Sequence, residues 1–225
     1  MAIERIGNLT RIQSNVNSDS QSISVPNDAT LIVVGVSGYS GAGYFANGSI
    51  TLNGSALTEL AADSNGSYTQ GLLGYLVNPS TGTQTLAWDW DGTGAPAAGV
   101  ILVYGFYKGV DTASLVRDSY SLQQAYAATI QTDTMTASDG DYAIAWVGGY
   151  GSSATFSWTN ATKVADFDVA SGYNTTLGTW AEATLSGNTQ ITCTGNIDMC
   201  IMALVLKPAA AGGTSILRQM IAHSE

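Results

Sequence analysis

The sequence predicts an all-β protein, an antiparallel β-sandwich of the jelly-roll-like kind, and three observations carry this prediction. Short apolar runs rich in β-branched residues recur along the 225-residue chain. Asn-Gly and Asp-Gly pairs separate many of these runs, and such pairs tolerate the positive φ of tight hairpins. No long stretch before residue 214 shows a helical period. Many short strands separated by turns are typical of a sandwich or barrel.

Three apolar runs, residues 31–36, 99–104 and 201–206, are the expected centre of the fold. Runs of this length between turn residues suit strands that are buried on both faces. Residues 85–90 alternate instead, and the alternation predicts a half-buried strand. One face of that strand is expected to carry Leu86, Trp88 and Trp90.

A weak internal repeat divides the chain into two halves. Residues 28–39 align with residues 139–150, and the run 100–108 aligns with the run 200–207. Each half therefore reads as a strand, a Gly-Tyr loop, a hairpin and an apolar strand that ends in lysine. Two matching halves suit a jelly-roll-like sandwich, so we expect one domain over residues 1–208. Two small tandem domains are the alternative.

Residues 209–225 are expected to form a linker and a short docking tail. The run from Pro208 to Gly213 is typical of a flexible linker. Four apolar side chains then fall on one face of a short helix: Ile216, Leu217, Met220 and Ile221. A helix of this length is not stable alone. We therefore expect it to dock on its own sandwich or on a neighbouring subunit.

The two cysteines, Cys193 and Cys200, flank a segment that is expected to turn at Gly195-Asn196. Across such a hairpin the two side chains could face each other and form a disulfide. Synthesis in a cytoplasm disfavours that bond, and a short loop gives it limited entropic stabilisation. Both states, a bonded pair and two free thiols, remain open at this point.

The charge of the chain argues against nucleic acid as a partner. The net charge is −10, only 11% of residues are charged, and the seven basic residues are scattered. Binding nucleic acid requires several phosphate contacts from Lys or Arg. No signal peptide and no apolar run of roughly 20 residues is present. We therefore expect synthesis in a cytoplasm, no membrane partner and a surface built mainly from Ser, Thr, Asn and Gly.

The sequence indicates no catalytic residues, no cofactor and no metal. The single histidine, His223, lies in the tail, far from a serine–acid pair. Only four glutamates occur, whereas a glycosidase requires two facing carboxylates. The close pair Asp139 and Asp141 completes no calcium-loop pattern, so we interpret it as a turn.

Two tyrosines are the candidate recognition residues. Tyr39 and Tyr150 fall in Gly/Ser-rich segments at equivalent places in the two halves. Most other aromatic side chains are expected in the core, because burying a large apolar side chain contributes roughly 1.5–3 kcal/mol. The alternative is that both tyrosines only anchor their loops.

Several segments resemble β-sandwich structural proteins from the virions of tailed bacteriophages. The resemblance rests on Tyr75-Leu76-Val77-Asn78-Pro79-Ser80-Thr81-Gly82-Thr83-Gln84-Thr85-Leu86 and on the segment from Val103 to Ala113. The strand over residues 31–38 and the closing run 203–208 also fit. Proteins of this kind serve as head decoration, head-fibre and tail-fibre components.

The resemblance implies a non-enzymatic virion structural protein, foremost a decoration or cement protein that stabilises a phage head. Its implied partners are the major capsid protein, other virion proteins and copies of itself in a homo-oligomer. Its implied location is the virion, after assembly in the host cytoplasm. The alternative is a receptor- or glycan-binding module of a phage fibre or surface adhesin.

Overall fold

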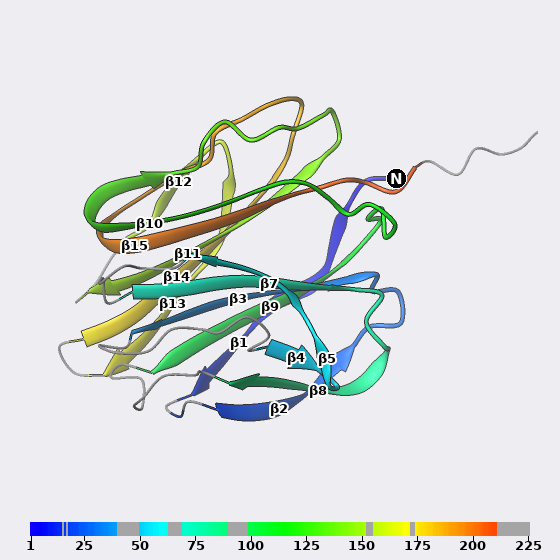
Figure 1. Cartoon of the computed structure of the whole chain (residues 1–225), viewed down its shortest axis with the longest axis horizontal. Coiled ribbons are helices and arrows are strands. Elements are labelled where there is room, and N and C mark those ends of the chain that lie inside the picture. The colour runs from blue at the N-terminus through cyan, green and yellow to red at the C-terminus, as the bar shows by residue number, and fades with distance from the viewer. Residues whose placement is uncertain are drawn as a thin grey trace, which may run out of the picture.

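The computed structural model describes residues 1–14, 16, 18–39, 50–62, 69–89, 99–151, 155–171 and 174–210. These residues form β-strands and no helix, and every strand pairing is antiparallel. The predicted all-β class and the antiparallel pairing are therefore confirmed. The strands belong to three sheets, which lie one above another (Figure 1).

We name the sheets by their place in the stack. The central sheet has the order β1 (Glu4–Ser14), β9 (Val100–Lys108), β3 (Leu31–Tyr39), β7 (Thr69–Val77) and β6 (Thr58–Ala62). The large outer sheet has the order β10 (Val116–Gln131), β15 (Thr192–Leu206), β11 (Tyr142–Gly151), β14 (Asn174–Thr184) and β13 (Thr162–Ser171), with β12 (Ser157–Thr159) on β15. The small outer sheet has the order β2 (Ser18–Val25), β8 (Gly82–Asp89), β4 (Ile50–Leu52) and β5 (Ser55–Ala56).

The central sheet is buried on both faces, which explains its unbroken apolar runs. Successive side chains of a strand point to opposite faces. In β3, Leu31 and Val33 pack with the large outer sheet, whereas Ile32 and Val34 pack with the small outer sheet. The same division holds along β9. The predicted buried strands are confirmed: 31–36 lies in β3, 100–104 lies in β9, and 201–206 lies in β15 of the large outer sheet.

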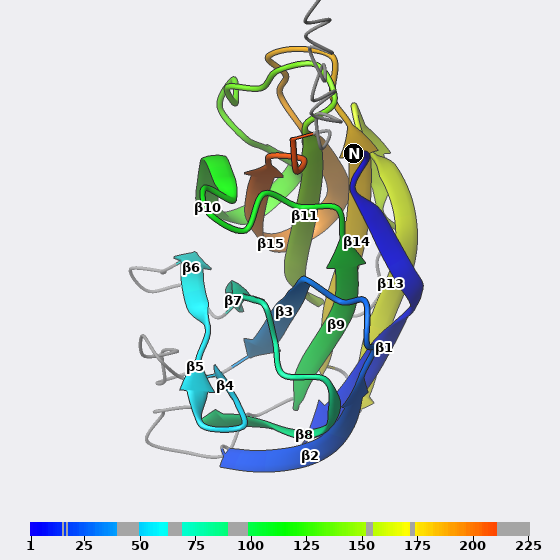
Figure 2. The same ribbon diagram turned by 90° about the vertical axis from the view of Figure 1, so that its right-hand side faces the viewer.

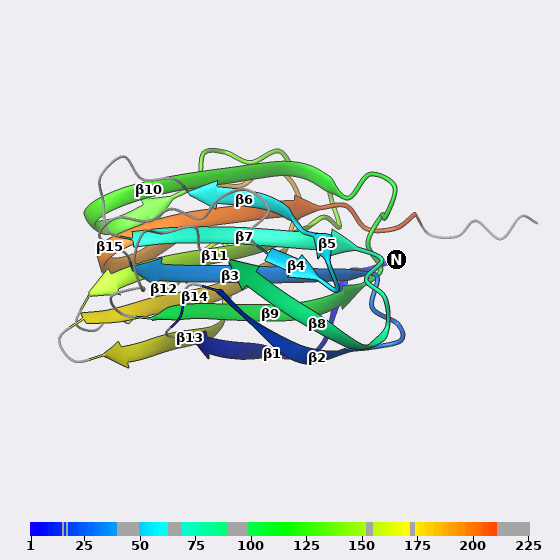
Figure 3. The same ribbon diagram turned by 60° about the horizontal axis from the view of Figure 1, so that its bottom comes forward.

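The small outer sheet covers one face of the central sheet. It lies in front when the bottom of the molecule is turned toward the viewer (Figure 3). Figure 2 shows β1 and β2 following each other along one side, from the central sheet into the small one. Leu86 and Trp88 of β8 point inward and are buried, as the alternation predicted. Trp90 lies outside the described residues.

Trp146 of β11 fills the space between the central and large outer sheets. Its indole is fully buried, and its Nε1 donates to the carbonyl of Val36 at 2.9 Å. Two glycines make room for the ring. A Cβ on Gly35 would lie 2.7 Å from Trp146 Cδ2, and a Cβ on Gly178 would lie 2.1 Å from Trp146 Cη2. The large indole of Trp146 therefore fits between the sheets because Gly35 and Gly178 have no side chains.

The predicted hairpin at Gly195-Asn196 is wrong, and of the two states left open for the cysteines the structure shows two free thiols. Both residues lie inside β15, which continues from Thr192 to Leu206. The register against β10 shifts at this point, and Asn196 has a φ of 54°. The turn signal therefore produces an irregularity of the β-bulge kind. A single long neighbour, β10, holds both parts of β15 in line.

The cysteines are consequently far apart on one strand. Seven residues of extended chain span roughly 20 Å, whereas the Cα atoms of a disulfide lie within about 7 Å. Cys193 and Cys200 are both free and buried. Burial raises the pKa of each thiol to about 12. Neither thiol is therefore a ready nucleophile near neutral pH.

The first prediction concerns Trp146 and its glycines. Gly178→Ala should lower the free energy of unfolding by about 1–3 kcal/mol, because the added Cβ overlaps the indole. The same substitution should cost less in a Trp146→Leu background, where the ring is absent. Urea unfolding of the four proteins measures both effects. Gly74→Ala is the control, because an added Cβ there would lie 3.2 Å from Leu57 Cδ2 and would not meet the indole. Equal costs in both backgrounds would contradict the packing argument.

The second prediction concerns the thiols. Titration with a thiol reagent near neutral pH should label almost nothing in the folded protein and two equivalents after unfolding in denaturant, since the chain has two cysteines. Slow labelling should follow the rate of global or local opening. Rapid labelling of either thiol in the folded state would show that the packing around β15 is looser than described.

Candidate functional site

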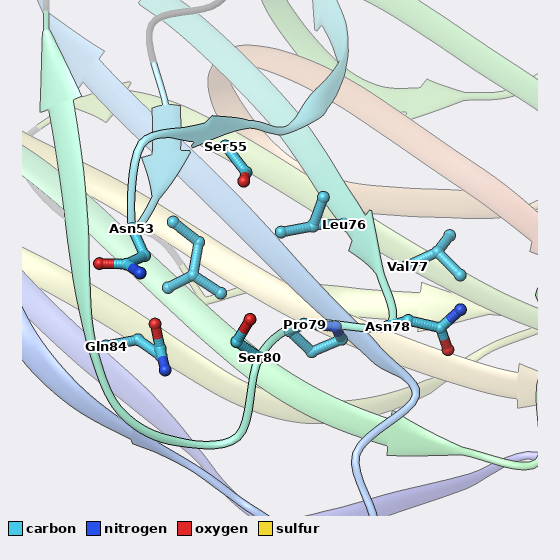
Figure 4. A pocket seen from close by; sticks show the side chains of 9 residues that line it. Asn53, Ser55, Leu76, Val77, Asn78, Pro79, Ser80 and Gln84 are labelled. Carbon is cyan, nitrogen blue, oxygen red and sulfur yellow. The ribbon is translucent and has the colours of Figure 1, made fainter.

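A polar pocket opens between the β4–β5 turn and the connection from β7 to β8 (Figure 4). Its volume is about 190 Å³, and residues from both connections line it: Leu52, Asn53, Ser55, Leu76, Val77, Asn78, Pro79, Ser80 and Gln84. Figure 4 shows the hydroxyls of Ser55 and Ser80 on opposite sides, with the amides of Asn53 and Gln84 beside them. The lining combines amides and hydroxyls with an apolar floor.

Local sequence rules build the rims of this pocket. Asn53 and Gly54 both have positive φ, 51° and 81°, as the predicted Asn-Gly turn requires. The backbone N–H of Asn53 donates to the Thr85 carbonyl at 2.7 Å, which ties the turn to β8. On the other rim, the backbone N–H of Asn78 donates to the Thr30 carbonyl at 2.8 Å, and Pro79 is buried.

Gln84 brings an unsatisfied acceptor to the pocket. Its Nε2 donates to the Thr81 carbonyl at 3.0 Å, which fixes the orientation of the amide. Its Oε1 is buried and has no hydrogen-bond partner among the described residues. A buried acceptor without a donor costs about 1–3 kcal/mol. Gln84 Oε1 is therefore an unsatisfied acceptor within the wall of the pocket, with almost no surface open to a ligand.

A buried carboxylate forms a second candidate site, between the central and large outer sheets. Glu182 of β14 is 8% exposed and accepts four hydrogen bonds. Oε1 accepts from the hydroxyl of Tyr107 at 2.7 Å and from Nε1 of Trp180 at 3.0 Å. Oε2 accepts from the hydroxyl of Tyr142 at 2.7 Å and from Nε of Arg5 at 3.3 Å. Its hydrogen-bonding capacity is thus taken up by the fold.

This cluster shifts the ionisation of its tyrosines. Burial, and then the negative charge of Glu182, raise the pKa of Tyr107 well above its ordinary value. Burial, together with the hydrogen bond to Glu182, raises the pKa of Tyr142 in the same direction. Both hydroxyls therefore stay protonated and act as donors. They are poor candidates for a general base near neutral pH.

An open groove of about 470 Å³ lies in front of this cluster. Its lining is Arg5, Tyr142, Thr162, Lys163, Val164, Glu182, Ala183 and Thr184. Glu182 is the one carboxylate in that lining, whereas glycoside hydrolysis uses two. Lys163 is paired with Asp166 at 2.7 Å. The arrangement is that of an inter-sheet link with a shallow groove outside it.

A second buried carboxylate also serves the fold. Asp141 is 1% exposed and forms an ion pair with Arg117 of β10. Its Oδ2 also accepts from the Ser138 amide at 2.8 Å. The predicted turn at Asp139-Gly140 is confirmed, with a Gly140 φ of 85°. Among the described residues, no group of three or more His, Cys, Asp or Glu side chains could hold a metal ion.

The sequence predicted the two candidate recognition tyrosines in loops, but the structure places both in strands. Tyr39 is the last residue of β3 and pairs with Thr69, and its side chain is not among those described. Tyr150 lies within β11, half-buried, and pairs with Thr176 and Asp198. The Gly/Ser-rich composition misled the prediction, because glycine also occurs in strands that pack closely against neighbours. The recognition role of both residues stays a prediction.

The predicted docking residues Ile216, Leu217, Met220 and Ile221 lie outside the described residues. The described residues end at Ala210. Pro208 still bridges to Val110, and the Ala209 amide donates to the Gly109 carbonyl at 2.7 Å. The N-terminal amine of Met1 donates to the Ala209 carbonyl at 2.8 Å. The two ends of the described chain therefore meet (Figure 1).

Sequence reasoning missed both Glu182 and Gln84. A usable signal existed for Glu182. It lies two residues after Trp180 in an alternating strand, so both side chains point to the same buried face. Nothing comparable marked Gln84, because its pocket depends on the approach of two turns that are 25 residues apart in sequence, at positions 53 and 78.

Comparison of the chain with protein-family models, with curated proteins and with solved structures finds no match. Within the described ranges, no helix is long and apolar enough to cross a membrane.

The third prediction concerns alkaline pH. The pKa of Tyr107 in the folded protein lies above its value of about 10 in the unfolded chain. The stabilisation that this hydroxyl contributes is therefore fully present below about pH 10. Above that pH the unfolded chain releases the proton first, and the free energy of unfolding should fall by about 1.4 kcal/mol per pH unit for this group. Tyr142 and both thiols act in the same direction.

Tyr107→Phe should make this decline shallower between pH 10 and the folded pKa, although it loses stability at neutral pH. Urea unfolding at several pH values measures the slope. Phe106→Leu is the control, because it weakens packing on the same strand without removing a titrating group. An identical slope in Tyr107→Phe and the parent protein would contradict the assignment.

Proposed function

We propose that the protein is a non-enzymatic structural component of a virus particle, a decoration or cement protein on the head of a tailed phage. The observation that carries the proposal is the position of Ala209, next to the last described residue, on the folded body. Met1 and Ala209 are hydrogen-bonded to each other, and both lie at one end of the long axis (Figure 1). A body that carries its attachment segment at one end is suited to standing on a shell.

The surface of the body supports attachment through that segment. Among the described residues, Met1 and Val16 are the exposed large hydrophobic side chains. Large exposed apolar patches mark protein-protein interfaces, and the described surface offers little of this kind. We propose that the segment with Ile216, Leu217, Met220 and Ile221, which lies outside the described residues, is the apolar element that contacts a shell protein or another copy.

The buried carboxylates also support a structural role. Glu182 joins β14 to Tyr107 and Arg5 of the central sheet, and Asp141 joins the start of β11 to Arg117. Asp198 is a third buried carboxylate among the described residues. Glu182 and Asp141 are buried groups of the kind that a catalytic site would draw on. Here their hydrogen bonds hold sheets and strands together.

We further propose that the central and large outer sheets form a sandwich of two repeated halves, the arrangement behind the jelly-roll-like prediction. The support is the strand order. If β12, which lies off the main order, is left aside, the first strand of each sheet along the chain lies at one edge, followed across the sheet by the fifth, second, fourth and third. In this scheme β3 matches β11, as the aligned segments 28–39 and 139–150 require, and β9 matches β15, as the aligned runs 100–108 and 200–207 require.

The fourth prediction tests the particle role. Quantitative mass spectrometry of purified particles from the organism that carries the sequence should find many copies, in fixed proportion to the major shell protein. A chain ending at Ala210 keeps the bonds of Ala209, so it should retain its melting temperature. It should be incorporated at least about tenfold less, because it loses the apolar segment.

Tyr150→Ala is the matched control, and it should be incorporated normally if attachment runs through the C-terminal segment. A handful of copies per particle would favour a fibre or receptor-binding role. Absence of the chain from particles would contradict every virion role. Normal incorporation of the shortened chain would contradict attachment through residues 211–225.

A further inference from the structure

We propose that the outer edge of β10 pairs antiparallel with β10 of a second copy of this chain, so that two large outer sheets join into one. The inference goes beyond the particle role proposed above and does not depend on the C-terminal segment. Three features carry it: an edge that no described strand covers, the absence of the features that protect the other edges, and side chains that complement themselves across a twofold axis.

β10 is a long edge strand of the large outer sheet. Among the described strands it pairs with β15 alone, and Figure 2 shows it at one margin of that sheet, above β6 at the margin of the central sheet. Its register against β15 shifts before Asp118 and after Gln124 but is continuous between these two residues. Residues 118–124 therefore form a regular strand, and an edge of this kind offers main-chain donors and acceptors to another strand.

The other edges of the described sheets carry features that discourage pairing. β1 bears three charged side chains and holds Gly7 at a φ of 69°, where its register shifts. β13 also bears three charges, and β5, β6 and β12 have two, five and three residues. β2 bears Asp19, and the side chains that it exposes are all polar. Charge, irregularity and short length protect an edge strand, whereas residues 119–131 of β10 carry no charge.

The side chains of the regular segment complement themselves. In an antiparallel pair with its twofold axis at Ser121, each residue faces the one at the same distance beyond Ser121 on the second copy. Tyr120 then faces Leu122 and Leu122 faces Tyr120, which gives two aromatic–aliphatic cross-strand pairs. Both side chains are half-buried and pack against the same apolar cluster of the large outer sheet. The pairing therefore extends a face that is already apolar.

The same register keeps like charges apart. The chain has a net charge of −10, so two copies repel each other and favour contact through a neutral segment. With the axis at Ser121, Asp118 faces the uncharged Gln124 of the second copy, whereas an axis at Asp118 would oppose two carboxylates. Asp118 already accepts from the backbone N–H groups of Ser119 at 2.8 Å and Thr136 at 2.6 Å. A dimer through this segment is therefore compatible with the acidity of the chain.

The test measures the mass of the full chain in solution by sedimentation velocity over a range of protein concentrations. The 23.2 kDa chain should reach twice that mass as the concentration rises. Ser121→Lys and Ser121→Glu should each weaken the dimer by about tenfold or more, because like charges then face each other at the axis. An equimolar mixture of the two variants should restore the dimer, since a lysine then faces a glutamate.

Ser22→Lys and Ser22→Glu are the matched controls, because they make the same changes of charge at an exposed position of the edge strand β2. Both should dimerise like the parent protein. A monomer at every concentration, an unweakened dimer in both Ser121 variants, or no recovery in their mixture would overturn the proposal. Loss of the dimer in a chain ending at Ala210 would also overturn it and assign the contact to the C-terminal segment. None of these outcomes depends on the presence of the chain in particles.

Discussion

The stack of sheets depends on how Trp146 is enclosed. Its ring lies between the central and large outer sheets, where a side chain on Gly35 or Gly178 would overlap it. Close packing of this kind is intolerant of added volume. The two sheets can therefore approach only in the register that brings both glycines to the ring. The bond from Trp146 Nε1 to Val36 fixes the same register through a directional contact.

Polar links at the margins of this core add further constraints between the same two sheets. Glu182 reaches Tyr107 and Arg5 near one end of β9, and Thr176 donates to the Gly99 carbonyl at 3.1 Å near the other. Each link satisfies groups that would otherwise be buried without a partner. The apolar core supplies most of the stability, and these links restrict the sheets to one arrangement.

The fold was largely predictable from the sequence, whereas the candidate sites were not. Burial on both faces gives β3, β9 and β15 their apolar runs, and burial on one face gives β8 its alternation at Leu86 and Trp88. The two-residue period of a strand makes both patterns visible in the sequence. Glu182 has partners far away in the chain, Tyr107 and Arg5, and Gln84 lines a pocket whose other rim is the turn at Asn53. Gly195-Asn196 shows the opposite error, since a sound turn signal was overridden by the pairing of β15 with its neighbours.

The sequence by itself determined the all-β class, the central strands and the turns at Asn53-Gly54 and Asp139-Gly140. These depend on side-chain alternation and on backbone angles, which are properties of adjacent residues. The tertiary structure alone decided that three sheets stack, that the cysteines share one strand, and that the distant turn at Asn53 approaches Gln84. These outcomes depend on which strands pair, and strand pairing is set by the packing of the whole chain.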